Sequence, residues 1–274
     1  MIPKIVHQTW KNEQIPEKWK ESHDSWKSLA RYGWEYKLWT DELMRQFIAE
    51  HYDWFLAQYD SYPQNINRVD AWRYFVLHHY GGLYTDLDNV CKPKSFLTFY
   101  ELIKNEDVAL PKVKQGNGNK EHNVTNCFIA STVGSNFWPH VWRMLQNPYK
   151  HYPYKSTVGS MSKYFNVIFT TGPSLLAESY NSYNAKDSVY LIPAEMCQPL
   201  DDSVPKPHDT RESIIKVIGG NSWHPKDAQF ILFFRDLMRH SSVILGVFIA
   251  MCLCVIIGLS VTVAHSKRIQ RSST

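Results

Sequence analysis

Residues 68–91 read RVDAWRYFVLHHYGGLYTDLDNVC and decide how the chain is interpreted. The first part contains no glycine or proline and is predicted to be a helix. It ends at Gly81-Gly82, because glycine adopts positive φ angles at little steric cost. A short strand carrying Asp86 and Asp88 is expected next. Side chains alternate along a strand, so these two carboxylates are predicted to share one face, about 7 Å apart.

The chemistry of these carboxylates indicates a cation and a phosphate ligand. Two carboxylates at the end of a strand suit a hard divalent cation and the diphosphate that it carries. On the preceding helix, Asp70 and Arg73 are i,i+3 neighbours on the face where the strand emerges. A D-x-D triplet alone is usually two surface carboxylates, and a lone Asp–Arg pair is usually a solvated ion pair. The full order of D-x-x-R, apolar run, Gly-Gly and D-x-D indicates a functional site far more specifically than either motif alone.

With these motifs the sequence resembles glycosyltransferase family 32, whose members transfer sugars from nucleotides and carry a DxD motif. The resemblance covers about residues 2–230 and includes five further blocks: IPKIVHQTW (2–10), WEYKLWTD (34–41), VTNCFI (124–129), TGP (171–173) and GNSWHPKDA (220–228). The last block is most similar to the inositol phosphoceramide mannosyltransferase branch. Cys127 departs from the family, which often has an acidic residue at this position.

The resemblance implies a metal site that takes Mn²⁺ or Mg²⁺. Asp88 is the expected main ligand. Asp86 is expected chiefly to contact the ribose or the sugar hydroxyls, with contact to the metal as the alternative. His224 is expected to complete the metal shell, by analogy with a late histidine in related folds. The alternative for His224, a turn histidine bonded to the backbone, stays open at this point.

The resemblance also implies roles toward the nucleotide-sugar donor. Asp70 and Arg73 correspond to the clamp on the sugar hydroxyls, and Asn126 is expected to reach the transferred sugar or the acceptor. Together with Asp86, these are the predicted catalytic residues. His7, in the first strand, is expected near the donor base. The family retains anomeric configuration, which implies front-face substitution with the departing phosphate as the base.

The predicted elements favour an α/β fold. A strand at 4–9, a helix at 16–30, a strand at 34–39 and a helix at 41–50 capped by Thr40 start a parallel, Rossmann-like sheet. Further helices are predicted at 51–62, 66–80, 95–105, 136–146, 161–169 and 174–183, and strands at 107–112, 125–131, 189–192 and 214–218. This order predicts a single Rossmann-like domain over residues 1–240, and the resemblance implies that it is a GT-A type nucleotide-sugar transferase domain.

Composition adds a predicted membrane anchor. Residues 241–264 carry no charged side chain and would reach about 36 Å as a helix, enough to span a bilayer. A short basic tail, 265–274, follows. A lone C-terminal anchor with no N-terminal signal predicts a cytosolic domain, whereas the resemblance predicts a lumenal domain in the Golgi or endoplasmic reticulum; both stay open.

The net charge of +4 gives no argument for nucleic acid, and the five cysteines show neither metal-ligand spacing nor a disulfide framework.

Three functions are compared. The first is a membrane-anchored, metal-dependent retaining hexosyltransferase that moves mannose from GDP-mannose to the lipid inositol phosphoceramide, with a regulatory membrane subunit as partner. The second uses GDP-mannose, UDP-galactose or UDP-glucose and a glycoprotein or another glycolipid as acceptor. The third is a non-catalytic sugar-binding membrane adaptor, and the intact set of predicted site residues argues against it.

Overall fold

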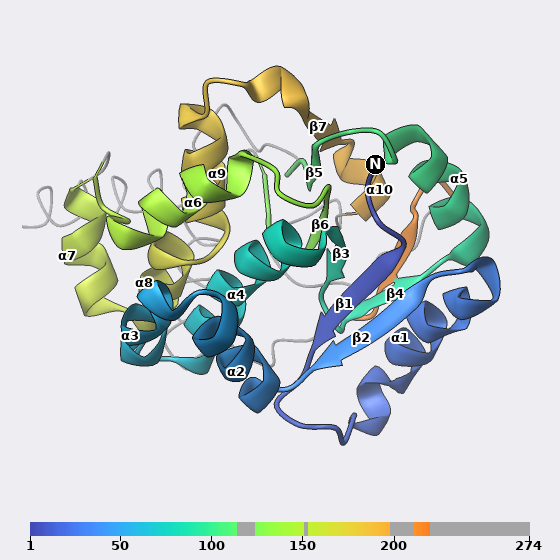
Figure 1. The fold of residues 1–274 in the computed structure, drawn as a ribbon, viewed down its shortest axis with the longest axis horizontal. Coiled ribbons are helices and arrows are strands. Elements are labelled where there is room, and N and C mark those ends of the chain that lie inside the picture. The colour runs from blue at the N-terminus through green and yellow to red at the C-terminus, as the bar shows by residue number, and fades with distance from the viewer. Residues whose placement is uncertain (114–123, 151–152, 198–210, 220–274) are drawn as a thin grey trace, which may run out of the picture. The chain divides into compact units, whose positions relative to one another are not determined.

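The computed structural model describes residues 1–113, 124–150, 153–197 and 211–219 (Figure 1). The chain divides into two compact units, Met1–His224 and Pro225–Thr274. His224, the predicted span at 241–264 and the tail at 265–274 lie outside the described residues, so the predicted boundary at residue 240 stays a prediction. Within the described ranges, no helix combines the length and apolar character needed to cross a membrane.

A central sheet organises the first unit. Its strand order is β2-β1-β3-β6-β5-β7. The strands are β1 (Ile5–Thr9), β2 (Glu35–Trp39), β3 (Gly82–Thr85), β5 (Val108–Pro111), β6 (Phe128–Ser131) and β7 (Val189–Ile192). β2, β1 and β3 are parallel, as are β5 and β7, but β6 is antiparallel to both of its neighbours. The parallel start predicted from the sequence is confirmed, and the sheet as a whole is mixed, as in a GT-A-like fold.

Helices cover both faces of this sheet (Figure 1). One face packs against α2 (Asp41–His51), α3 (Asp53–Ser61), α4 (Asn65–Tyr80), α6 (Phe137–Gln146) and α9 (Pro173–Ser182), and the other against α1 (Glu17–Lys27), the 3₁₀ helix η1 (Ser28–Tyr32) and α5 (Pro93–Ile103). The remaining helices are α7 (Tyr154–Met161), α8 (Lys163–Thr170), η3 (Lys186–Ser188) and α10 (Ala194–Cys197). Neighbouring strand residues serve opposite cores: Leu83 packs with one cluster and Tyr84 with the other.

Helix α4 is the centre of the larger core. Its residues from Asp70 to Leu77 are all buried, so no side of this stretch faces water. Such a helix carries polar groups inside the fold, and these must be paired there. The cap predicted for the neighbouring helix α2 is confirmed, because Thr40 Oγ1 accepts a hydrogen bond from the Leu43 amide at 3.2 Å.

The two glycines after α4 allow β3 to begin at once. Gly81 and Gly82 have φ angles of +62° and +88°. A Cβ atom on Gly82 would lie 2.5 Å from the carbonyl oxygen of Ile5 in the paired strand β1. The close approach of β1 and β3 therefore requires glycine at this position.

Gly82→Ala is expected to lower the free energy of unfolding by about 2–3 kcal/mol, through positive-φ strain and displacement of β1. Gly33→Ala is the matched control, because Gly33 has a φ of +79° but an added Cβ there would meet nothing within 4 Å. Its cost should stay near 1 kcal/mol. Chemical denaturation of both variants measures the difference, and equal costs would contradict the role given to the β1–β3 contact.

Candidate active site

The DxD motif lies in a tight turn. β3 ends at Thr85, and the Asn89 amide donates to the carbonyl oxygen of Asp86 at 3.1 Å, which closes the turn. We call Asp86-Leu87-Asp88 the DxD turn. The predicted strand carrying both carboxylates on one face is therefore wrong. The chain leaves the central sheet here and continues as β4 (Asn89–Cys91), which pairs with β8 (Ile215–Val217) in a separate two-stranded sheet.

Side chains behind the DxD turn hold it in place. The Asn89 amide group donates to Thr85 Oγ1 at 3.1 Å and to the Cys127 carbonyl oxygen at 3.0 Å. The Asp86 backbone amide also donates to the Cys127 carbonyl, at 2.9 Å. The segment before β6 and the turn after β3 are thus tied together, although about 40 residues separate them in the sequence.

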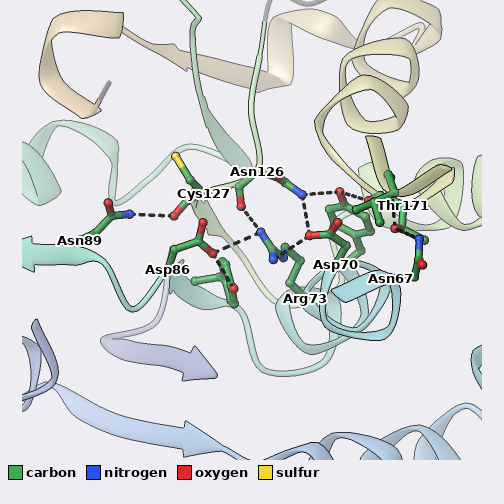
Figure 2. Close-up of polar contacts among 11 residues, drawn as sticks. Asn67, Asp70, Arg73, Asp86, Asn89, Asn126, Cys127 and Thr171 are labelled. Carbon is green, nitrogen blue, oxygen red and sulfur yellow. Dashed lines mark hydrogen bonds and ion pairs between the residues drawn. The ribbon is translucent and has the colours of Figure 1, made fainter. Parts of the chain in front are cut away.

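Arg73 links the DxD turn to helix α4 (Figure 2). Its guanidinium forms an ion pair with Asp70 Oδ1 at 2.8 Å, donates to the Asn126 carbonyl oxygen at 2.6 Å and lies 3.5 Å from Asp86 Oδ1. It also lies 4.3 Å from the ring centre of Tyr84. Because only 2% of Arg73 is exposed, this cation is held by the fold rather than by solvent.

Asp70 is fixed by several donors from different elements. Its Oδ1 accepts from Asn126 Nδ2 at 3.0 Å as well as from Arg73. The hydroxyl of Thr171, in the TGP block, also hydrogen-bonds to the Asp70 carboxylate. Three segments, namely α4, the segment before β6 and the turn before α9, therefore meet at Asp70.

The two carboxylates of the DxD turn differ in their surroundings. Asp86 Oδ1 accepts a hydrogen bond from Tyr84 Oη at 2.8 Å, while no described contact involves its Oδ2. The Asp88 carboxylate has no described partner side chain. Burial, and then the negative charge of Asp86, raises the pKa of Asp88 to about 7. Burial also raises the pKa of Asp70 to about 6, against the opposing effect of Arg73.

These residues line one cleft of about 560 Å³. Asp70, Arg73, Asp86, Asp88 and Asn126 all contribute to its walls, so the structure brings together five of the seven predicted site residues. Cleft residues that the sequence analysis did not assign include Trp10, Lys11, Trp19, Asp41, Asn65 and Tyr84. Tyr84 could have been assigned from the sequence, because it lies two residues before Asp86. His224, the predicted third metal ligand, lies outside the described residues.

The structure does not bring His7 to the cleft. His7 is fully buried in β1, where Trp39 Nε1 donates to its Nδ1 at 3.1 Å and its Nε2 lies 3.0 Å from the Gly81 carbonyl oxygen. An Nδ1 that accepts leaves the proton on Nε2, which therefore donates to Gly81. Both ring nitrogens are thus engaged inside the protein, and the predicted contact with the donor base has no free atom to make it.

Burial lowers the pKa of His7 to about 4, which predicts a pH dependence of stability. Because the unfolded chain binds this proton more tightly, His7 should remove about 3 kcal/mol of stability as pH falls from 6.5 to 4. His7→Gln should lower stability at pH 7.5 by losing packing and hydrogen bonds, but its deficit should shrink toward pH 4.5. Urea denaturation at both pH values measures this, and a deficit independent of pH would contradict it.

The chain is similar to known glycosyltransferases. Residues 16–109 match the family described as "Glycosyltransferase sugar-binding region containing DXD motif". Inositol phosphoceramide mannosyltransferase 3 of Schizosaccharomyces pombe is 35% identical over 233 residues, covering 85% of this chain and 58% of that protein. Mannosyl phosphorylinositol ceramide synthase SUR1 of Saccharomyces cerevisiae is 33% identical over 236 residues, covering 84% and 54%. The chain thus spans little more than half the length of these relatives.

Among solved structures, the PaToxG glycosyltransferase superimposes with a TM-score of 0.44 and 17% identity, covering 68% of this chain and 72% of that chain. The family match includes the DxD turn, Asp70 and Arg73, and both yeast relatives are similar over most of this chain. The chain therefore belongs to glycosyltransferase family 32, with the yeast inositol phosphoceramide mannosyltransferases among its relatives.

Proposed function

We propose that this protein is a metal-dependent retaining hexosyltransferase that transfers mannose from GDP-mannose to inositol phosphoceramide at a Golgi or endoplasmic reticulum membrane. The observation that carries the proposal is the single cleft that joins the DxD turn to the Asp70–Arg73–Asn126 cluster. Its volume lies within the range typical of small-molecule sites. The yeast relatives support mannose as the sugar and a sphingolipid as the acceptor.

The residues of the DxD turn fit a divalent cation. Asp88 and the Oδ2 atom of Asp86 are hard oxygen donors without described protein partners, which suits Mn²⁺ or Mg²⁺. Among the described residues, no cluster of three histidine, cysteine or acidic side chains could hold a metal. Diphosphate oxygens, water or His224 would then complete the shell. Bound there, the cation would neutralise charge on the leaving diphosphate.

The other residues would position the sugar. Asp70 is held by Arg73, Asn126 and Thr171, so its remaining acceptor capacity can bind sugar hydroxyls in one orientation. A carboxylate that is only 4% exposed and paired with a buried arginine is a poor nucleophile. This favours front-face substitution, in which the departing phosphate takes the acceptor proton.

The test uses the full chain with GDP-mannose, UDP-glucose or UDP-galactose, each with Mn²⁺, Mg²⁺ or EDTA. Acceptors are inositol phosphoceramide, a different glycolipid and a mannosylated glycoprotein. Mass spectrometry identifies the product, and NMR gives its anomeric configuration. Mannosylated inositol phosphoceramide, formed with retention and lost in EDTA, is the expected result. A folded protein that binds donors but transfers to no acceptor would favour the sugar-binding adaptor.

A further inference from the structure

The cleft extends well beyond the DxD turn. Its walls include Thr9 and Trp10 at the end of β1 and Asp41 just after β2. β3, β1 and β2 are parallel neighbours, so their carboxyl ends lie along one edge of the sheet. Two strand spacings, about 10 Å, separate the strand before Asp41 from the strand before the DxD turn. A nucleotide with its diphosphate at the DxD turn would therefore direct its other end toward Asp41.

Asp41 is prepared to accept hydrogen bonds in this part of the cleft. Asn65, at the start of α4, donates from its Nδ2 to Asp41 Oδ1 at 2.9 Å, and both residues line the cleft. No described contact involves Asp41 Oδ2. The carboxylate is thus oriented by one neighbour and keeps acceptor capacity on both oxygens.

An aromatic surface lies on the neighbouring strand. Trp10 follows β1 and its backbone amide donates to the Trp39 carbonyl oxygen at 3.0 Å, which places it beside the chain that leads to Asp41. Trp10 is one of the residues that line the cleft. A carboxylate at the end of one strand and an aromatic ring on the next form a site for a planar heterocycle with N–H groups on its edge.

We propose that Asp41 is a specificity-determining residue that reads the guanine base of the donor. Guanine presents two adjacent donors, N1–H and the 2-amino group, which a carboxylate can accept together. Uracil presents a single N–H between two carbonyl oxygens, and these would face the carboxylate unfavourably. The inference rests on the proposed function, because that function places the diphosphate at the DxD turn.

Asp41 also has a simpler structural role, since an acidic residue in the first turn of α2 interacts favourably with the helix dipole. That role predicts no change in base preference when the charge is removed. Asp53 begins α3, is exposed, and accepts a hydrogen bond from the Trp54 amide at 2.8 Å. It does not line the cleft, so Asp53→Asn is a matched control for the loss of a helix-terminal carboxylate.

The experiment measures Mn²⁺-dependent binding of free nucleotides to the full chain by calorimetry. The ligands are GDP, IDP, XDP, UDP and 2′-deoxy-GDP. IDP lacks the 2-amino donor and XDP has a carbonyl oxygen in its place. Wild type and Asp53→Asn should bind GDP about 10- to 100-fold more tightly than IDP, XDP or UDP. Asp41→Asn should lose the preference for GDP over IDP and bind XDP more tightly than GDP, because its amide group can donate to the new carbonyl.

The other outcomes are informative in different ways. An unchanged GDP preference in folded Asp41→Asn would overturn the assignment and leave the proposed transferase intact. Altered discrimination between GDP and 2′-deoxy-GDP alone would also overturn it, by placing Asp41 on the ribose. A wild type that prefers UDP would reject the proposed donor together with this inference. If Asp41→Asn does not fold, Asn65→Ala, which removes only the hydrogen bond to Asp41 Oδ1, should reduce the GDP-to-IDP ratio at least threefold, and an unchanged ratio would overturn the assignment.

Discussion

Asp88→Asn is expected to lower the rate of sugar transfer by about 1,000-fold while the protein stays folded. The variant removes the carboxylate that we expect to be the main metal ligand, but no described side chain depends on that carboxylate. Asn keeps the size of Asp and is a much weaker ligand for a hard cation. Transfer measured at saturating Mn²⁺ with GDP-mannose and inositol phosphoceramide gives the rate, and Asp53→Asn should retain wild-type activity.

The same substitution should not reduce stability. The pKa of Asp88 is raised in the folded protein to about 7, so folding disfavours its charged form. An acid whose folded pKa is raised loses stability as pH increases from its unfolded value toward the folded one. At pH 8 without metal, Asp88→Asn should therefore be at least as stable as the wild type. A destabilised variant, or one retaining more than a tenth of the activity, would contradict the interpretation of Asp88 as a metal ligand whose buried charge lowers the stability of the folded protein.

The sequence predicted the elements that rest on strong local patterns. Helix α4, the Thr40 cap and β7 occur where the apolar pattern and capping chemistry placed them. The helix predicted at 161–169 is a shorter α8, and it is preceded by α7, which was not predicted. A buried ion pair at 3.3 Å joins α7 to α9 through Lys155 and Glu178, and the charged residues needed for such a pair weaken any apolar pattern.

The candidate site was predictable in composition but less so in geometry. Residues of the family motifs, such as Asp70 and Asn126, do gather in one cleft. The DxD turn was missed because strand alternation says nothing about where pairing stops, and pairing of β3 stops at Thr85. Asp41 was not assigned to the site, since its contact with Asn65 joins positions 24 residues apart. His7 was misplaced because burial in a central strand depends on tertiary neighbours.

Arg73→Met should be the most destabilising change in the site, lowering the free energy of unfolding by about 3–5 kcal/mol at pH 8. The variant leaves Asp70 buried without its cation and leaves the Asn126 carbonyl without the donor at 2.6 Å. Arg73→Lys keeps the charge but supplies a point cation in place of a planar group that reaches three partners. Arg73→Lys should lower the free energy of unfolding by about 2 kcal/mol and the rate of sugar transfer about 100-fold, because Asp70 and Asp86 would no longer be held together.

The pH dependence separates this explanation from a simple packing defect. Arg73 lowers the pKa of Asp70, which burial has raised to about 6, so its removal should raise that pKa further. In the wild type, the loss of stability caused by ionisation of Asp70 therefore stops growing near pH 6. In Arg73→Met it continues to grow above pH 6. The stability deficit of the variant should accordingly be larger at pH 8 than at pH 5.5.

An exposed arginine provides the control for this experiment. Arg45 makes a bidentate pair with Asp60, at 2.9 Å and 2.7 Å, but the two side chains are 55% and 40% exposed. Arg45→Met should therefore cost less than about 1 kcal/mol, with no deficit that grows from pH 5.5 to pH 8. Because both pairs have close contacts and differ in burial, a large deficit confined to Arg73→Met would show that burial makes this arginine indispensable. Equal deficits in the two variants, or an Arg73→Met deficit that does not change with pH, would mean that Asp70 does not depend on Arg73 for its charge.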